Sequence, residues 1–376
     1  MKRRNIMIAF VIIVVLLVIF RAIVINYEKE EVIRIGAVLP LTGIGSIYGQ
    51  YPQEGMEIAL EEINSNEGIN GKKLEIIYEN SLSDTKTAVT SFEKLVNINN
   101  VSVVLVGAFS PETIAQAPFS EENKIVLLAS GSAAPKIRFM GDYIFRIKVS
   151  VEKEMEELMK FAYNDLDSRK ISILYSQNDY GEGIKESTIS EFKKLNGEII
   201  NVEGFRTEEA DFKTILTKIK DDDSDVVVLG GLPRNMGWIL KQAKELNVNK
   251  QFISPAGTIG PEIIEIAESG SNGLIYIMEF NIEDDREELI KFKEKYKKLY
   301  GEDPNLFSAM GYDSLKLTAN ALRVCGDESE CIKNNFYTVQ NYSGASGIIS
   351  FDEYGDVLKP MIMMTIKNEK FVRYKV

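Results

Sequence analysis

The side chains that most often carry out chemistry in proteins are scarce in this chain. It contains no histidine and only two cysteines, Cys325 and Cys331. Without histidine there are no Ser-His or Cys-His nucleophiles and no histidine-ligated metals, and two cysteines alone make half a zinc site. Carboxylate or lysine chemistry remains open, but no pair of acidic residues stands in an apolar setting. The composition therefore favours binding over catalysis, with no metal and no cofactor.

The first loop that could form a site follows an apolar stretch at residues 33–39. Gly43 and Gly45 lie in it, but no third glycine completes the G-x-G-x-x-G pattern of dinucleotide binding, and the G-K-[ST] of a P-loop is missing. A tight turn explains the glycines. It does not explain Tyr48, and aromatic walls are typical of small-molecule sites. We expect Tyr48, in this loop, to form one wall of a cleft.

Three more candidate positions follow expected strands. Ser110 precedes Pro111, so it is a helix N-cap, a ligand contact or both, because a helix N-terminus is itself a good carboxylate site. Ser132 lies in the loop 130–133, whose hydroxyls and backbone N–H groups could hold an anion; the alternative is a plain loop. Tyr180 begins a Tyr-Gly turn and is either a cleft residue or an ordinary surface tyrosine.

Strands and helices alternate from residue 32 onward, which predicts parallel sheets with helices on both faces. The expected strands are 33–39, 74–79, 101–106, 125–129, 143–147, 171–175, 198–205, 226–229, 251–253 and 274–278. The expected helices are 55–64, 85–97 with Asp84 as N-cap, one opened by Ser110, 152–166, 183–195, 212–220, 235–246, 287–300 and 307–324. The last two strands, 347–351 and 361–367, are expected to pair antiparallel. The pattern predicts an α/β fold of two Rossmann-like lobes whose loops face one cleft.

The amino terminus predicts a signal segment over residues 1–27. Three basic residues precede an unbroken apolar run, 6–20, which has no small-x-small cleavage site after it. With its extension to Ile25 the run approaches the ~20 residues that a spanning helix requires. An uncleaved membrane anchor is therefore favoured over a cleaved signal peptide. The basic residues before the run leave the body outside the cytoplasm.

The net charge of the chain is −12 at pH 7. Nucleic-acid binding requires basic surface to meet phosphates, so this class of partner is excluded.

Cys325 and Cys331 are separated by five residues. Outside the cell, a disulfide that closes this small loop is favoured over two free thiols.

Taken in order, several segments carry a resemblance that extends over nearly the whole chain from Ile33. They are residues 35–43, 55–71, 129–135, 179–183 and 346–356. The sequence resembles the extracytoplasmic solute-binding proteins of branched-chain amino acid ABC transporters, which have the type 1 periplasmic binding fold. In that family a serine after one strand and a Gly-Ala-Thr/Ser loop after the next hold the ligand's carboxylate and amine. A tyrosine from the other lobe closes over the ligand, and an acidic residue pairs with the amine.

The resemblance implies ligand-binding roles for particular residues of this chain. Ser110 matches the first serine, Ser132 and Ala133 match the loop, and Tyr48 and Tyr180 match aromatic cleft positions. Ala133 stands where a hydroxyl residue is expected.

A second departure concerns the acidic residue. Ala256, in the segment 254–257, replaces it, and Leu232 stands where an aromatic residue is common. Burying an ammonium group without a carboxylate partner carries a large desolvation penalty. A site with Ala256 at this position therefore suits an acid without an amine, an amide or another small polar molecule better than an amino acid. Glu279, Asp179 or Glu182 could supply the charge instead.

The sequence therefore predicts a solute-binding protein of an ABC importer, without enzymatic activity, that closes its lobes on a small solute and presents a surface to permease subunits. The expected division is 28–148 plus 280–345 for lobe 1 and 149–279 plus 346–376 for lobe 2. The alternative is a ligand-binding sensory domain. The expected location is extracytoplasmic, anchored by the amino-terminal helix, or secreted if that helix is cleaved.

Overall fold

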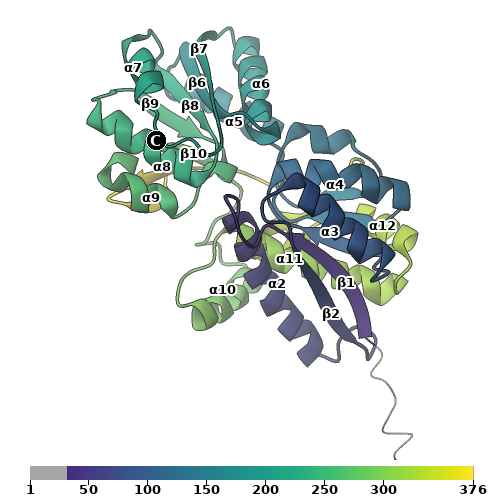
Figure 1. Ribbon diagram of the computed structural model, residues 1–376. Helices are drawn as coiled ribbons and strands as arrows, with labels where there is room; N and C mark the ends of the chain where they lie inside the picture. Colours follow the sequence, from purple (N-terminus) through teal and green to yellow (C-terminus); the bar gives the residue numbers. More distant parts are fainter. Residues whose placement is uncertain (1–31, 376) are drawn as a thin grey trace, which may run out of the picture.

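The structure is a computed structural model that describes residues 32–375, and it has two lobes, each built on its own sheet (Figure 1). Lobe 1 has five parallel strands in the order β2-β1-β3-β4-β5. Their bounds are β1 Val32–Leu39, β2 Lys73–Asn80, β3 Val103–Val106, β4 Val126–Ala129 and β5 Ile144–Arg146. The predicted α/β class with parallel-sheet lobes is confirmed.

Both faces of the first sheet are buried, as its apolar strands require. Ile35 and Leu105 point to one face, against α2 and α11, whereas Val38 and Val104 point to the other, against α3 and α4. The helices of this lobe are α2 Ile47–Ser65, α3 Thr85–Asn97, α4 Ser110–Asn123, α10 Glu287–Tyr300, α11 Leu306–Cys325 and α12 Ser329–Tyr337. Asp84 caps α3 as predicted, because its carboxylate accepts the N–H of Thr87 at 2.8 Å.

Lobe 2 has seven strands in the order β14-β13-β10-β9-β8-β6-β7. The parallel strands are β6 Lys170–Ser176, β7 Glu198–Phe205, β8 Val226–Gly230, β9 Gln251–Ser254 and β10 Ile275–Met278. The antiparallel strands are β13 Ile362–Lys367 and β14 Lys370–Arg373. One face is covered by α5 Val151–Asn164 and α6 Asp179–Lys194, and the other by α7 Lys213–Asp221, α8 Pro233–Glu245 and α9 Glu262–Ala267.

The chain passes between the lobes three times: after β5, after β10, and between β12 (Gly347–Ile349) and β13. The residue bounds given above for the lobes remain a prediction.

The predicted pairing of strand 347–351 with strand 361–367 is wrong. β12 pairs with β11 (Tyr342–Gly344), and β13 pairs with β10 and β14. The turns of the two hairpins, β13–β14 and β11–β12, each have a local cause. The turn at Asn368 and Glu369 has φ of 51° and 56°, the left-handed region that two-residue hairpins use. In the other hairpin, the buried carboxylate of Asp313 accepts the N–H groups of Ala345 and Ser346, each at 2.7 Å.

The signal segment predicted at residues 1–27 lies outside the described residues. Within residues 32–375, none of the helices is long and apolar enough to cross a membrane.

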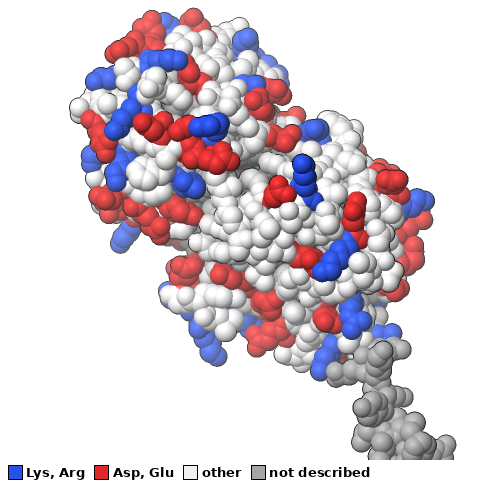
Figure 2. Space-filling model, viewed as in Figure 1, with Lys and Arg blue, Asp and Glu red and all other residues white. Residues whose placement is uncertain are grey.

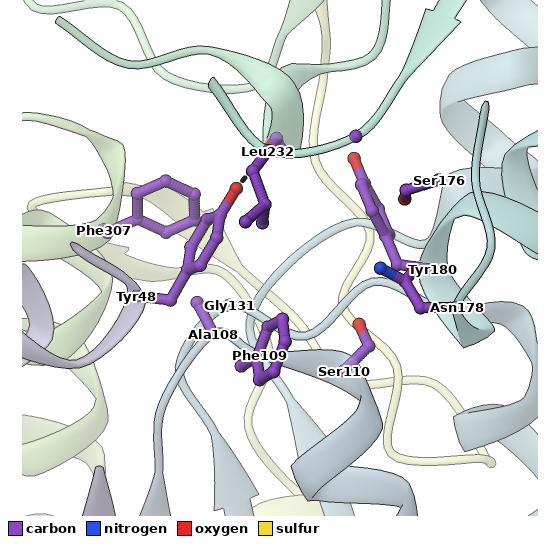
Figure 3. Close-up of a pocket in the computed structure, with 12 residues that line it drawn as sticks. Tyr48, Ala108, Phe109, Ser110, Gly131, Ser176, Asn178, Tyr180, Leu232 and Phe307 are labelled. Carbon is purple, nitrogen blue, oxygen red and sulfur yellow. Dashed lines mark hydrogen bonds between the residues drawn. The ribbon is translucent and has the colours of Figure 1, made fainter. Parts of the chain in front are cut away.

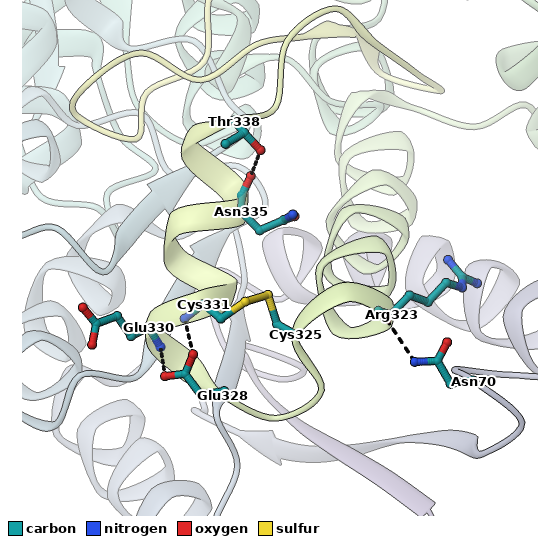
Figure 4. The surroundings of a disulfide bond; sticks show 8 residues. All are labelled: Asn70, Arg323, Cys325, Glu328, Glu330, Cys331, Asn335 and Thr338. Carbon is teal, nitrogen blue, oxygen red and sulfur yellow. Dashed lines mark hydrogen bonds between the residues drawn. A yellow bond between two sulfur atoms is a disulfide. The ribbon is translucent and has the colours of Figure 1, made fainter.

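Cys325 and Cys331 form a disulfide between the end of α11 and the first turn of α12 (Figure 4). Glu328 caps α12, accepting the N–H of Cys331 at 2.7 Å, so the loop closed by the disulfide also starts a helix.

Candidate ligand-binding cleft

A small cavity of about 20 Å³ lies between the lobes, at the carboxyl ends of strands from both sheets (Figure 3). Helices α2 and α4 of lobe 1 and α6 and α8 of lobe 2 begin beside it. The residues that line the cavity are Tyr48, Ala108, Phe109, Ser110, Gly131, Ser176, Asn178, Tyr180, Gly231, Leu232, Gly257 and Phe307. Since a single water needs ~10–15 Å³, the lobes are closed and leave room for little more than one water.

Tyr48 lies in the first turn of α2 and not in the predicted loop. Its ring is buried and meets Phe307 edge-on, with centroids 5.1 Å apart. Two glycines bring these rings together. A Cβ at Gly55 would lie 1.9 Å from the carbonyl oxygen of Ser308, and one at Gly311 would lie 2.1 Å from that of Pro52. Helices α2 and α11 can therefore pack closely along their length, which aligns their first turns.

The hydroxyl of Tyr48 connects the lobes. It donates a hydrogen bond of 2.9 Å to the carbonyl oxygen of Gly257, on the loop after β9. Burial, followed by the nearby Glu262 carboxylate, raises the pKa of Tyr48 well above its ordinary value, so the hydroxyl stays protonated.

Tyr180 lies in the first turn of α6, where the sequence predicted a turn before the helix. Its hydroxyl is fully buried and its proton has no acceptor among the described residues, although the backbone N–H of Gly257 lies near the oxygen. Burial, with the Glu154 carboxyl as the next cause, raises the pKa of Tyr180 well above its ordinary value. The side chain is therefore a neutral donor whose proton is unpaired within the described residues, and it is not an ordinary surface tyrosine.

Ser110 is the first residue of α4, and Phe109 occupies the N-cap position without a side-chain bond, so the N-cap reading of Ser110 is wrong. The Ser110 Oγ instead accepts the N–H groups of Ala133 and Ala134 at 3.2 and 3.3 Å. Two donors occupy its lone pairs, so its own proton is free for a ligand oxygen.

Three of the other predicted site residues do not line the cavity. The hydroxyl of Ser132 is bonded to that of Thr113 at 2.6 Å and donates to the carbonyl of Gly107 at 3.3 Å. Ala133 gives its N–H to Ser110, as described above. Ala256 is buried, and its neighbour Gly257 reaches the cavity instead. The loop 130–133 thus acts by fixing Ser110.

Ser176 and Phe307 line the cavity but were not predicted. Ser176 ends β6, and its buried hydroxyl has no partner among the described residues. The position resembles that of Ser130, a polar residue after an apolar strand, and this signal could have identified it. Phe307 reaches the cavity only because α11 returns from lobe 2 to pack on α2, which no local pattern indicates.

No charged residue lines the cavity within the described chain. The three acids that could have supplied a charge each face a cation. Glu279 accepts Lys148 at 2.7 Å, Asp179 lies 4.0 Å from Lys136 across the lobes, and Glu182 pairs with Lys185. Four helix N-termini, each with a partial positive charge, surround the site. The face drawn in Figure 2 has a largely uncharged surface between the lobes, with acidic side chains spread over both lobes.

Comparison with known proteins places this cleft in a family. Residues 32–370 match the family described as periplasmic binding protein. The Leu/Ile/Val-binding protein homolog 1 of Brucella abortus is 26% identical over 337 residues, which cover 88% of this chain and 89% of that protein.

Two solved structures are similar over 91% of this chain and 98% of theirs. A leucine binding protein from Thermotoga maritima has a TM-score of 0.86 at 26% identity. A branched-chain amino acid transporter substrate binding protein from Streptococcus pneumoniae, solved with isoleucine, has a TM-score of 0.85 at 28% identity. The family match covers most of the chain and includes both lobes and the cleft between them, so the chain belongs to the periplasmic binding proteins, as the sequence resemblance indicated.

Proposed function

We propose that this chain is the extracytoplasmic solute-binding component of an ABC importer, and that its solute is a small monocarboxylate with an apolar body and no α-amine. Family membership supports the first part, since the family is described as periplasmic binding protein and a similar transporter protein was solved with a bound amino acid. The observation that carries the second part is the cavity wall, which offers unpaired hydroxyl donors and no anionic acceptor.

An α-ammonium group would be poorly held in this cleft. A buried cation without a carboxylate partner carries a large desolvation penalty. Ala256 provides no carboxylate, and the three acids that the sequence offered in its place already face lysines. Glu262 lies near Tyr48 but does not line the cavity. The relatives that bind branched-chain amino acids therefore support the fold and the mode of binding more than the identity of this solute.

A carboxylate matches the donors that are free. The Ser110 proton and the Tyr180 hydroxyl come from opposite lobes, so one carboxylate could accept from both only when the lobes are together. The aligned N-termini of α4 and α6 add a favourable potential for negative charge. Phe109, Leu232 and Phe307 supply apolar contacts for the rest of the molecule.

Closure is supported by contacts that cross the cleft. Besides the Tyr48–Gly257 hydrogen bond, η1 (Pro135–Phe139) of lobe 1 packs on α6 of lobe 2, where a Cβ at Gly183 would lie 2.4 Å from Pro135. A hinge motion that forms and breaks these contacts fits the capture and release of a solute.

The test is a matched set of ligands in a thermal-shift assay and in calorimetry on the purified protein. Leucine, 4-methyl-2-oxopentanoate and 4-methylpentanoate share one carbon skeleton and differ only at the α-carbon. The two acids without an ammonium group are expected to bind at least tenfold more tightly than leucine. If leucine gives the largest thermal shift, the proposed solute class is wrong.

A further inference from the structure

A second, larger cavity lies between the lobes next to the first one. Its volume is about 310 Å³, and Phe307 lines both cavities. We call this second cavity the side chamber. In Figure 3, Phe307 and Tyr48 stand at one end of the drawn group, whereas Ser110, Ser176 and Tyr180 stand at the other. The polar end of the binding cleft is therefore the end away from the side chamber.

The walls of the side chamber are apolar and come from both lobes. Tyr51 in α2 and Phe307 in α11 belong to lobe 1. Tyr276 and Met278 lie two residues apart on β10, so they point to the same face of the lobe 2 sheet, and Met364 on β13 also lines the chamber. A molecule in the chamber would touch both lobes, so its binding would favour the closed arrangement.

The sizes of the two cavities indicate how a solute would divide between them. An apolar cavity of ~150 Å³ is enough to take up benzene. The side chamber, at about 310 Å³, is roughly twice that size, whereas the binding cavity holds about 20 Å³. A carboxylate head fits between the lobes after a small opening, but the bulk of an apolar body finds more room beyond Phe307.

The charges at the rim restrict the far end of such a molecule. Glu302 lines the chamber and has no ion-pair partner among the described residues, whereas Asp303 beside it pairs with Lys297 at 3.4 Å. A second carboxylate placed here would meet the uncompensated charge of Glu302. The chamber therefore suits a neutral tail.

We infer that the solute is longer than an amino acid, and that it is a monocarboxylate whose neutral apolar tail, of about phenyl size or larger, passes Phe307 into the side chamber. This inference rests on the proposed function, because it needs the carboxylate to bind at the Ser110–Tyr180 end. It adds that the tail, and not only the head, decides which carboxylate is captured.

The experiment is calorimetric titration with phenyl-terminated acids of increasing length: benzoate, 3-phenylpropanoate and 5-phenylpentanoate. The longest acid is expected to bind at least tenfold more tightly than benzoate, at one molecule per chain. Heptanedioate, with a second carboxylate at its far end, is expected to gain nothing from its length.

Two variants on neighbouring positions of β13 locate the tail. Met364→Trp fills the side chamber and should abolish the advantage of the longest acid while benzoate binds as before. Met363→Trp makes the same change on the opposite face of β13, where Met363 packs with the α5 side of the sheet, and should keep the advantage.

The outcomes separate the two proposals. If benzoate and the longest acid bind equally, if two molecules bind per chain, or if both variants behave alike, the side-chamber inference is wrong and the proposed function stands. If none of the acids binds while leucine does, both are wrong.

Discussion

The two tyrosines of the cleft predict opposite effects for the same small change. Both rings are buried between the lobes, and replacing either with phenylalanine removes only a hydroxyl. In Tyr48 that hydroxyl donates to the carbonyl of Gly257 at 2.9 Å, whereas in Tyr180 its proton has no acceptor among the described residues and only the Gly257 N–H lies near its oxygen. In the ligand-free protein we therefore expect Tyr180→Phe to stabilise the closed chain and Tyr48→Phe to destabilise it.

The size of the effect follows from the hydrogen-bonding state. An unsatisfied buried donor costs ~1–3 kcal/mol, and a satisfied hydrogen bond contributes ~0.5–1.5 kcal/mol. With an unfolding entropy of ~2 cal/mol/K per residue, ~1–3 kcal/mol is a rise of roughly 1–4 °C in Tm for a chain of this length. Differential scanning calorimetry of the ligand-free variants measures this shift. With the bound carboxylate, Tyr180→Phe should lose the new hydrogen bond and weaken binding by roughly tenfold.

The two variants control for each other, because they remove the same atom from the same kind of side chain in one cavity. The reasoning is refuted if Tyr180→Phe lowers the ligand-free Tm as much as Tyr48→Phe does. It is refuted equally if Tyr180→Phe binds the solute as tightly as the unaltered protein, since the hydroxyl would then have no ligand to meet.

Three further changes test other parts of the structure. Burial raises the pKa of Glu154 from 4.5 to about 8 beside Lys148, so the folded chain keeps a proton that the unfolded chain releases. The free energy of unfolding therefore falls as pH rises from about 4.5 to about 8. Glu154→Gln should flatten the resulting fall in Tm across that window. Ala256 itself stops short of the cavity that Gly257 lines, but the longer side chain of Ala256→Glu can extend to it, so this variant should raise leucine affinity at least tenfold in calorimetry and the neutral Ala256→Gln should not. Replacing Cys325 and Cys331 with serine removes a link across a short loop, worth ~2 kcal/mol, and should lower Tm by roughly 3 °C while ligand affinity stays the same.

Most of the fold was predictable because the strands are short apolar runs between polar helices. The run at Val103–Val106 is fully buried, as its sequence indicates. The helix starts were harder to predict. The first turns of α2 and α6 contain glycine, tyrosine and polar residues with no apolar stripe, so Tyr48 and Tyr180 were placed in loops although both are helical. The strand partners of β12 and β13 depended on tight turns that the apolar pattern does not encode.

The candidate site was predictable only where it is local. Ser110 and Tyr180 follow strand ends, and sequence order alone puts strand ends at one edge of a sheet. Phe307 depends on the close packing of α11 against α2, which Gly55 and Gly311 permit over a long separation in sequence. Whether a hydroxyl is satisfied is also a property of the assembled cleft, so the contrast between Tyr48 and Tyr180 has no sequence signal.

The acidic composition and the proposed anionic solute are compatible because the charges are separated in space. A net charge of −12 opposes the approach of an anion, but salt screens surface charges beyond ~8 Å at physiological ionic strength. The cavity wall itself carries no carboxylate among the described residues, and of the acids near it Glu279 is paired with Lys148 and Asp179 faces Lys136. The local field then comes mainly from the helix N-termini, which favour negative charge. Lys136→Glu removes the cation that faces Asp179 and adds a second acid beside it, at the edge of the cleft. We therefore expect this variant to bind the carboxylate with a lower association rate, and the decrease should be largest at low salt.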